Sequence, residues 1–350
     1  MKRFKLLHVI DDPKFIGMCK TTFEIDICEN LFTTSRDWNP KDISVDFIFI
    51  HYLSAISIKK ILGHHFEKPL IWFFWGGDAF NLGKFYNEFL TNNAIKLRRN
   101  LAWKRSISEG FNVTVKTELP FVIDKFLYGK ETLKAIQSFD KIVPIMPGDS
   151  SLLLSYYDLT VNSFHLNYVN PTLDRPPSFT HGVNILLGNS ASYTNNHMEI
   201  IDFLAAMDLS NRQVIIPLNY GDMDYALAVQ SYAENKLGDI AYPLMDFLPF
   251  NEYQDLLASC SVVIMNHKRQ QALGNIIQAL YSGSKIVLRS ESTVFKYLLE
   301  NGFVIEDMDQ LNLKSLDHED QIHNSNLCQS VFGKKRQHDR VRELLKELLR

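Results

Sequence analysis

The sequence predicts an α/β fold with two Rossmann-like parallel-sheet domains that face a cleft, followed by a C-terminal amphipathic helix. Short apolar runs alternate with longer segments of helical periodicity along most of the 350 residues. Strands that are apolar on both faces and separated by helices are typical of parallel sheets covered on both sides. The length allows two ordinary cores, since domains usually contain about 100–200 residues.

The predicted strands are the short apolar runs at residues 4–10, 45–53, 70–75, 139–146, 183–188, 212–218, 260–266 and 285–289. The predicted helices lie between them, near residues 55–62, 84–106, 122–136, 196–208, 223–237, 251–258, 272–282 and 292–300. Residues 170–181 contain three of the twelve prolines and little periodicity, which indicates a linker. We therefore expect domains at 1–172 and 173–333, with a charged amphipathic helix at 334–350.

The composition excludes some classes of protein. Lys plus Arg is 37 against 40 for Asp plus Glu, so the chain lacks the basic excess of a nucleic-acid binder. The four cysteines show no paired spacing, which favours free thiols in a reducing cytosol. The basic, apolar N-terminus is too short and charged for a signal peptide, and no run approaches the roughly 18 apolar residues of a membrane span. We expect a cytoplasmic protein, either soluble or attached to a membrane from one side.

In folds of this kind a ligand binds at the carboxyl ends of the strands, so the loops that follow strands are the candidate sites. The first such loop, residues 188–197, is rich in small residues and leads into a helix. Gly188, Asn189 and Ser190 would offer backbone N–H groups to a phosphate at that helix start. An ordinary strand-to-helix turn is the alternative. The dinucleotide and P-loop glycine motifs are both missing from the sequence, so nicotinamide cofactors and P-loop chemistry lose their main support.

The second loop, residues 266–275, brings many donors to one helix start. Arg269 can bind phosphate oxygens in a bidentate manner, and the helix dipole adds to this attraction. Gln270 and Gln271 can hold sugar hydroxyls or phosphate, and Gly274 and Asn275 begin the helix. The alternative is a polar surface loop without function.

Two residues of the first half are candidates for catalysis. Asp78 follows a buried strand and a Gly-Gly step, which places it where it could deprotonate an acceptor hydroxyl. The alternative role for Asp78 is that of a helix N-cap. His51 ends another apolar strand, and a lone histidine at such a position is more often structural than catalytic.

One stretch, residues 96–105, is strongly basic in an otherwise acidic chain and contains a tryptophan. Such a composition suits a helix that lies on an anionic lipid surface. The membrane-docking residues would be Lys96, Arg98, Arg99, Trp103, Lys104 and Arg105. The alternative is a solvated helix packed through Leu97, Leu101 and Trp103.

The sequence predicts no metal site and no cofactor. Asp222 and Asp224, like Asp307 and Asp309, form short acidic strings of a kind that arises by chance, and we interpret them as solvated turn residues. His318 and His323 lack partners at zinc spacing.

The second half also resembles a known family around residues 183–290. The resemblance is carried by Ile185–Ser190, by Asn195–His197, by residues 214–220, and above all by Arg269–Gln271 with Gly274 and residues 283–288. In the first half, Trp75–Asp78 and His51 show a thinner likeness. The chain thus resembles the 4-acetamido-4,6-dideoxygalactose transferases of enterobacterial common antigen synthesis, glycosyltransferase family 56.

The resemblance implies a GT-B fold, a thymidine-diphosphate deoxysugar donor and an acceptor linked to polyprenyl diphosphate. Carried over by residue, it implies a donor site formed by Gly188, Asn189, Ser190, Tyr220, Arg269, Gln270, Gln271, Gly274 and Asn275, with Asp78 as base. The expected partners are thus a nucleotide-diphosphate sugar, a lipid-linked saccharide and the cytoplasmic face of a bacterial inner membrane, with no nucleic acid. Two alternatives remain: a nucleotide-sugar epimerase, and a non-catalytic sugar-nucleotide-binding partner. Inversion or retention at the sugar stays open.

Overall fold

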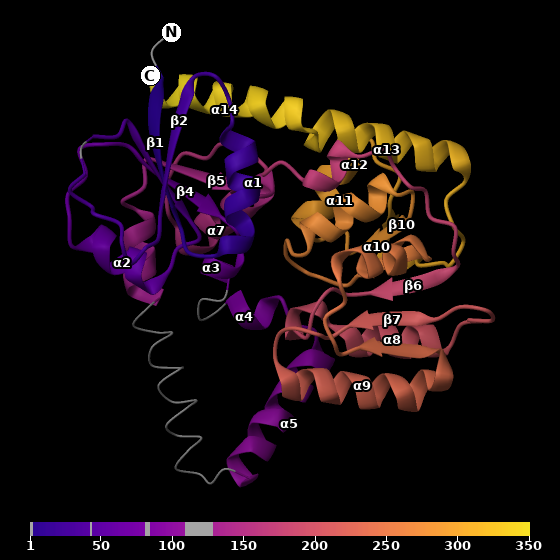
Figure 1. Ribbon diagram of the computed structural model, residues 1–350. Helices are drawn as coiled ribbons and strands as arrows, with labels where there is room; N and C mark the ends of the chain where they lie inside the picture. The colour runs from indigo at the N-terminus through magenta and orange to yellow at the C-terminus, as the bar shows by residue number, and fades with distance from the viewer. Residues whose placement is uncertain (1–2, 43, 81–84, 109–128) are drawn as a thin grey trace. The chain divides into compact units, whose positions relative to one another are not determined.

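The computed structural model describes residues 3–42, 44–80, 85–108 and 129–350 (Figure 1). The chain forms two compact units. The first contains Met1–Phe85, Leu119–Asp174 and Ser330–Arg350, and the second contains Tyr86–Glu118 and Arg175–Gln329. Each unit is built around its own parallel sheet.

The first unit has a five-stranded sheet in the order β2-β1-β3-β4-β5, and all of its strand pairs are parallel. Every residue of β3 and β4 is buried, so both faces of the sheet centre are covered. The strands are β1 Phe4–Ile10, β2 Cys28–Thr33, β3 Phe47–His51, β4 Leu70–Phe74 and β5 Lys141–Pro144. The helices are α1 Pro13–Phe23, α2 Ala55–Leu62, α3 Gly77–Phe80, α7 Pro147–Tyr157 and α14 Lys334–Leu348.

The second unit has a six-stranded parallel sheet in the order β11-β10-β9-β6-β7-β8. Its strands are β6 Asn184–Leu187, β7 Val214–Pro217, β8 Ala241–Leu244, β9 Cys260–Met265, β10 Lys285–Leu288 and β11 Glu306–Asp307. The chain runs outward from β6 through β7 to β8, and then returns to the other side of β6 at β9. The loops after β6 and β9 are therefore neighbours at the point where strand order reverses, which is where open α/β sheets bind ligands.

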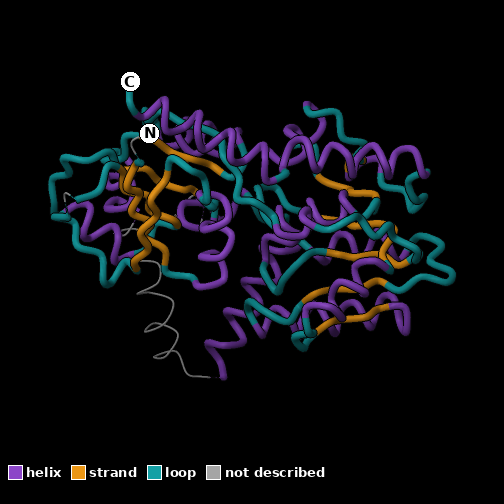
Figure 2. Tube along the Cα trace, turned by 45° about the horizontal axis from the view of Figure 1, so that its top comes forward, coloured by secondary structure: helices purple, strands orange, loops and turns teal. Residues whose placement is uncertain are grey.

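Helices cover the sheet of the second unit on both sides (Figure 2). They are α5 Asn92–Ser108, α8 His197–Ala205, α9 Met223–Leu237, α10 Phe250–Ala258, α11 Leu273–Tyr281, α12 Thr293–Glu300 and α13 His318–Phe332, which ends at the start of the last segment of the first unit. The short helix α4, Phe85–Glu88, precedes α5. Among the described residues no helix is both long and apolar enough to cross a bilayer.

The predicted fold class is confirmed, and each of the eight predicted strands corresponds to an observed one. The prediction missed β2 and β8, which are edge strands with one buried residue each, and β8 also contains Pro243. An edge strand needs fewer apolar residues and tolerates proline, so it lacks the signal of a buried strand. The sequence-based prediction also missed β11, α1, α7 and α13, and it merged α4 with α5 into one helix. Of the helix predicted near 122–136, residues 129–136 are helical, and residues 122–128 lie outside the described residues.

The compact units divide the chain differently from the predicted domains in two places. Helix α5 belongs to the second unit, because Ala94, Leu97 and Leu101 pack on the core around β6 and β7. Helix α14 is part of the first unit, because Val341 and Leu344 are fully buried in its core. Burial of an apolar stripe, and not distance along the chain, assigns both helices.

Candidate functional site

The two loops predicted to form the donor site are joined by hydrogen bonds at the carboxyl ends of β6 and β9. Gln271 Nε2 donates to Asn189 Oδ1 over 3.0 Å, and Gln271 Oε1 accepts from the Thr194 hydroxyl over 2.6 Å. The structure therefore brings residues about 80 positions apart in the chain into one polar cluster.

Two buried residues, Asn195 and His267, support this cluster through hydrogen bonds. Asn195 Oδ1 accepts from the backbone N–H of Asn189 over 3.0 Å and lies 2.8 Å from His267 Nε2. Because Asn195 Nδ2 donates to the Ser190 carbonyl over 2.9 Å, its Oδ1 must be the acceptor, which assigns the His267 proton to Nε2. Burial, with Arg269 nearby, lowers the pKa of His267 to about 3, so the ring stays neutral.

Gly188 is required by its backbone conformation and its surroundings. Its φ is +72°, and a Cβ there would lie 2.4 Å from His197 Nε2 and 2.7 Å from Asn195 Oδ1. Only glycine lets the chain turn directly after β6 while keeping the buried His197 beneath it. His197 in turn contacts the Tyr225 hydroxyl through Nδ1 over 2.9 Å.

The helix entrance at α11 carries the remaining predicted donor residues. Arg269 and Gln271 are half-buried, Gln270 is buried, and Gly274 is exposed with open space where a side chain would be. Arg269 Nη1 donates to the Gln270 carbonyl over 2.9 Å, which fixes the guanidinium beside the helix start. A helix of nine residues with a cation at its N-terminus has the electrostatics of an anion site.

Tyr220 and Asn275 lie at the edge of the same cluster. The Tyr220 hydroxyl accepts from Asn189 Nδ2 over 2.7 Å, and burial raises its pKa, although 49% of the residue's surface is exposed. Asn275 Nδ2 donates to the Tyr253 hydroxyl over 3.4 Å. The half-exposed ring of Tyr220 therefore leaves an aromatic surface accessible beside the groups that could donate hydrogen bonds to a phosphate.

Sequence reasoning missed a supporting network beneath the second loop. Arg289, which follows β10, donates through Nε to Asn266 Oδ1 over 2.7 Å and pairs with Glu199 of α8 at 3.2 Å. Asn266 also donates to the Asn196 carbonyl over 2.9 Å. Three segments thus fix the start of the loop that bears Arg269. Arg289 directly follows a buried strand, and Arg269 follows another buried strand after a few residues. The position of Arg289 was therefore the sequence signal that could have identified it as part of the site.

In the first unit, Asp78 is 6% exposed at the start of α3, just after β4. Its Oδ2 accepts from Trp72 Nε1 over 2.8 Å and from the Leu53 N–H over 3.1 Å. Its Oδ1 is buried and meets no donor in good geometry among the described residues. Burial raises the pKa of Asp78 to about 6, which suits a general base near neutral pH.

His51 is 2% exposed and both of its ring nitrogens contact side chains. Nε2 lies 2.9 Å from His8 Nδ1, and Nδ1 contacts the Tyr168 hydroxyl, which accepts from Trp75 Nε1 over 3.1 Å. Burial and the neighbouring His8 hold the pKa of His51 well below its usual range. This arrangement favours the structural alternative, in which His51 positions the loop after β4. A catalytic role for His51 remains a prediction.

The side-chain amide of Asn30 determines which ring nitrogens of His8 and His51 carry a proton. Asn30 Nδ2 donates to the Phe23 carbonyl over 2.8 Å, so Asn30 Oδ1 accepts from His8 Nε2 over 3.1 Å. His8 Nδ1 is then the acceptor for His51 Nε2, and Cys19 Sγ lies 3.5 Å from it. His8, Cys19 and His51 are close enough to hold a metal ion, yet both imidazoles have protein partners. The sequence-based expectation of no metal remains a prediction.

The six predicted membrane-docking residues divide between two faces of α5. Lys96, Arg99, Trp103 and Lys104 are exposed at helical spacing, and Trp103 is 67% exposed. Leu97 and Leu101 pack on the core of the second unit without Trp103, contrary to the packing alternative for that residue. Arg98 donates to Asn87 over 2.8 Å. Arg105 pairs with the carboxylates of Asp222, at 2.9 Å, and Asp224.

The two short acidic strings, Asp222 with Asp224 and Asp307 with Asp309, form hydrogen bonds with backbone N–H groups, and the first string also forms the ion pair with Arg105. Asp222 caps α9 by accepting from the Tyr225 N–H over 3.0 Å, and Asp307 accepts from the Asp309 N–H over 3.3 Å. For Asp222 and Asp224 the expectation of solvated turn residues is thus incomplete, because both carboxylates also pair with Arg105.

A family model described as 4-alpha-L-fucosyltransferase, glycosyl transferase group 56, matches residues 165–337. Over these residues the chain belongs to glycosyltransferase group 56. The match confirms the family predicted from the sequence, and it includes every predicted donor-site residue. The chain is a glycosyltransferase.

Solved glycosyltransferases share the fold along their whole length. HepE of Anabaena, solved with UDP and glucose, has 11% identity and a TM-score of 0.62, and the match covers 99% of this chain and 100% of that one. A glycosyltransferase of Rickettsia africae has 10% identity and a TM-score of 0.60, with 100% of both chains covered. Sucrose-phosphate synthase of Thermosynechococcus elongatus has 7% identity and a TM-score of 0.60, covering 100% and 99%. The GT-B fold is thereby confirmed.

Proposed function

We propose that this glycosyltransferase moves a deoxy- or aminosugar from a nucleotide-diphosphate donor, of the thymidine-diphosphate type, to a saccharide linked to polyprenyl diphosphate in surface polysaccharide synthesis. The observation that carries the donor half is the hydrogen-bonded cluster at the β6/β9 strand reversal, with Arg269 at the start of α11. The bound UDP of the Anabaena structure supports a nucleotide donor.

In this proposal the diphosphate binds at the α11 entrance. Arg269 and the backbone N–H groups of the 188–190 loop and of α11 stabilise the charge that grows on the leaving diphosphate. Gln270, Gln271 and Asn275 hold sugar hydroxyls or phosphate oxygens, and Tyr220 lies at the edge of the donor site. Asp78 of the first unit accepts the proton of the acceptor hydroxyl.

A calorimetric panel of dTDP, UDP, GDP, CMP and NAD tests the donor assignment. One nucleoside diphosphate is expected to bind wild type, and Arg269→Ala should weaken it about 10- to 100-fold, since a charge-assisted bond contributes about 1.5–3 kcal/mol. The matched control is Arg212→Ala, which removes an arginine that contacts the Val183 and Leu313 carbonyls elsewhere in the unit. Binding of NAD alone, or equal weakening by both variants, would refute the placement.

The membrane contact is proposed for the exposed face of α5. Lys96, Arg99 and Lys104 form no ion pair with a described residue, and Trp103 of the same helix is 67% exposed. Basic residues around an exposed aromatic fit an anionic lipid surface on the cytoplasmic side of the membrane. Co-sedimentation with phosphatidylglycerol vesicles is expected for wild type and should fall about fivefold for each of Lys96→Glu and Arg99→Glu. Lys335→Glu, on α14, is the charge-matched control and should leave vesicle binding unchanged.

A further inference from the structure

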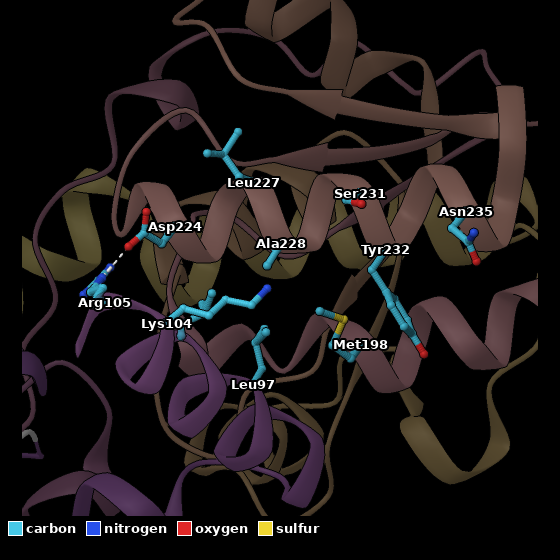
Figure 3. A pocket seen from close by; sticks show the side chains of 11 residues that line it. Leu97, Lys104, Arg105, Met198, Asp224, Leu227, Ala228, Ser231, Tyr232 and Asn235 are labelled. Atoms are coloured by element: carbon cyan, nitrogen blue, oxygen red, sulfur yellow. Dashed lines mark hydrogen bonds and ion pairs between the residues drawn. The ribbon is translucent and has the colours of Figure 1, made fainter. Parts of the chain in front are cut away.

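The second unit contains a groove of about 680 Å³ between α5, α8 and α9 (Figure 3). Its apolar part is formed by Leu97 and Leu101 of α5, Met198 of α8, and Leu227 and Ala228 of α9. One end carries the Arg105–Asp224 ion pair with Lys104, and the other carries Ser231, Tyr232 and Asn235. The size matches sites that hold small organic molecules.

The cations at one end of the groove differ in their pairing. Arg105 is neutralised by Asp222 and Asp224, which also ties α5 to the start of α9. Lys104 forms no ion pair with any described residue, and Figure 3 shows its side chain extending along the groove. An unpaired ammonium beside an apolar floor fits a ligand with an anionic head and a hydrocarbon chain.

Large apolar side chains are exposed on the two helices that contribute Lys104 and Leu227 to the groove. Leu227 is 52% exposed and Met223, one turn earlier on α9, is 62% exposed. Trp103 precedes Lys104 on α5 and is 67% exposed. Exposed apolar side chains on both helices, with Lys104 lining the groove between these helices, favour a lipid partner.

We infer that this groove binds one hydrocarbon chain of an anionic membrane phospholipid, with the phosphate against Lys104. The inference rests on the proposed membrane contact of α5 and goes beyond it, since surface contact needs only the charged face of that helix. A chain held between α5 and α9 would anchor the second unit at the bilayer more firmly than surface charge alone. Neither a sugar nor a nucleotide takes part, so the site can be tested apart from transfer.

The test measures calorimetric binding of monomeric dodecyl phosphate. Wild type is expected to bind it and not inorganic phosphate. Ala228→Phe, which fills the groove, should weaken binding at least tenfold, and Lys104→Glu should weaken it about tenfold. The matched control is Ala205→Phe, on an exposed position of α8 outside the groove, and it should bind as wild type does. Unchanged affinity in Ala228→Phe, or equal binding of inorganic phosphate, overturns the inference.

A second measurement identifies the source of the chain and separates this inference from the proposed function. After incubation with phosphatidylglycerol vesicles, native mass spectrometry should detect a retained phospholipid on wild type but not on Ala228→Phe. Ala228→Phe should still bind nucleoside diphosphate and sediment with vesicles, which shows that it is folded and that α5 docks independently. Retention by both proteins, or displacement of the phospholipid by an equal amount of polyprenyl phosphate, overturns the assignment to phospholipid.

Discussion

At the residue scale, Asp78 is the proposed general base, and its burial raises the pKa of its carboxyl group to about 6. The carboxylate is almost fully buried, accepts two hydrogen bonds through Oδ2 and leaves Oδ1 without a well-placed donor. An N-cap residue precedes the first helical residue, whereas Asp78 is the second residue of α3 and its Oδ2 contacts an indole and a loop. The alternative role of N-cap is therefore disfavoured by these contacts.

We predict that Asp78→Asn abolishes most sugar transfer without lowering stability. Loss of a general base typically reduces the rate about 10²–10⁴-fold. The amide oxygen can still accept from Trp72 and Leu53, and no charge is buried. Initial rates and urea unfolding of the same preparation measure the two effects. Transfer at the wild-type rate would exclude Asp78 as the base.

The raised pKa of Asp78 predicts two opposite pH dependences. Transfer should increase with pH and level off above about 6, because the base acts when deprotonated. Since the folded-state pKa lies above the ordinary carboxyl pKa of 3.8, this group's contribution to stability is complete below pH 3.8 and is lost as pH rises through about 6. Asp78→Asn should therefore be up to about 3 kcal/mol more stable than wild type at pH 7. If the free energy of unfolding changed with pH in the same way in wild type and in Asp78→Asn, this assignment would be contradicted.

Gly188 gives a prediction about backbone geometry in the donor site. Gly188→Ala should destabilise the protein by about 2–4 kcal/mol, because it combines a positive φ with a clash against the buried His197 and Asn195. Gly274→Ala is the control, since a Cβ there meets open space and φ is ordinary. Thermal unfolding of both variants measures the difference, and equal stability would show that the 188–190 loop is free to relax.

At the element scale, the amphipathic pattern predicted α14 but not where it packs. Its stripe of Val341, Leu344 and Leu345 is buried in the core of the first unit, and Lys141 of β5 pairs with Glu347 at its end. Helix α5 shows the same limitation, because its basic face was evident from spacing whereas its attachment to α8 and α9 was not. A stripe shows that a helix packs on something, and the surface that receives it is distant in sequence.

The packing of α14 predicts that Leu344→Ala lowers the free energy of unfolding by about 2–5 kcal/mol, as for other leucines cut back in a core. The control is Leu349→Ala, since Leu349 lies at the end of the same helix and is 60% exposed. Urea denaturation followed by circular dichroism compares the two. If the free energy of unfolding falls by the same small amount in both variants, α14 is not part of the folded core.

At the scale of the whole molecule, two sheets with separate cores carry different parts of the proposed reaction. Ligand that binds only the folded second unit should stabilise that unit by about 2.7 kcal/mol at a hundredfold excess over Kd. We predict that nucleoside diphosphate slows hydrogen exchange in residues 188–197 and 266–275 and leaves β1 and β3 unchanged. Arg269→Ala should remove the protection at the same ligand concentration. Uniform protection of both sheets would contradict a donor site confined to the second unit.

The sequence by itself determined the α/β class, the central strands and the two loops that follow β6 and β9, because buried parallel strands are continuous apolar runs and their carboxyl ends carry the ligand groups. The likeness at Arg269–Gln271 also identified the family before any geometry. Only the tertiary structure decided which polar groups support these residues, among them His267 and Arg289, and how the faces of α5 divide. The physical reason is that hydrogen bonds and burial join residues far apart in the chain, whereas a sequence pattern reports on neighbours.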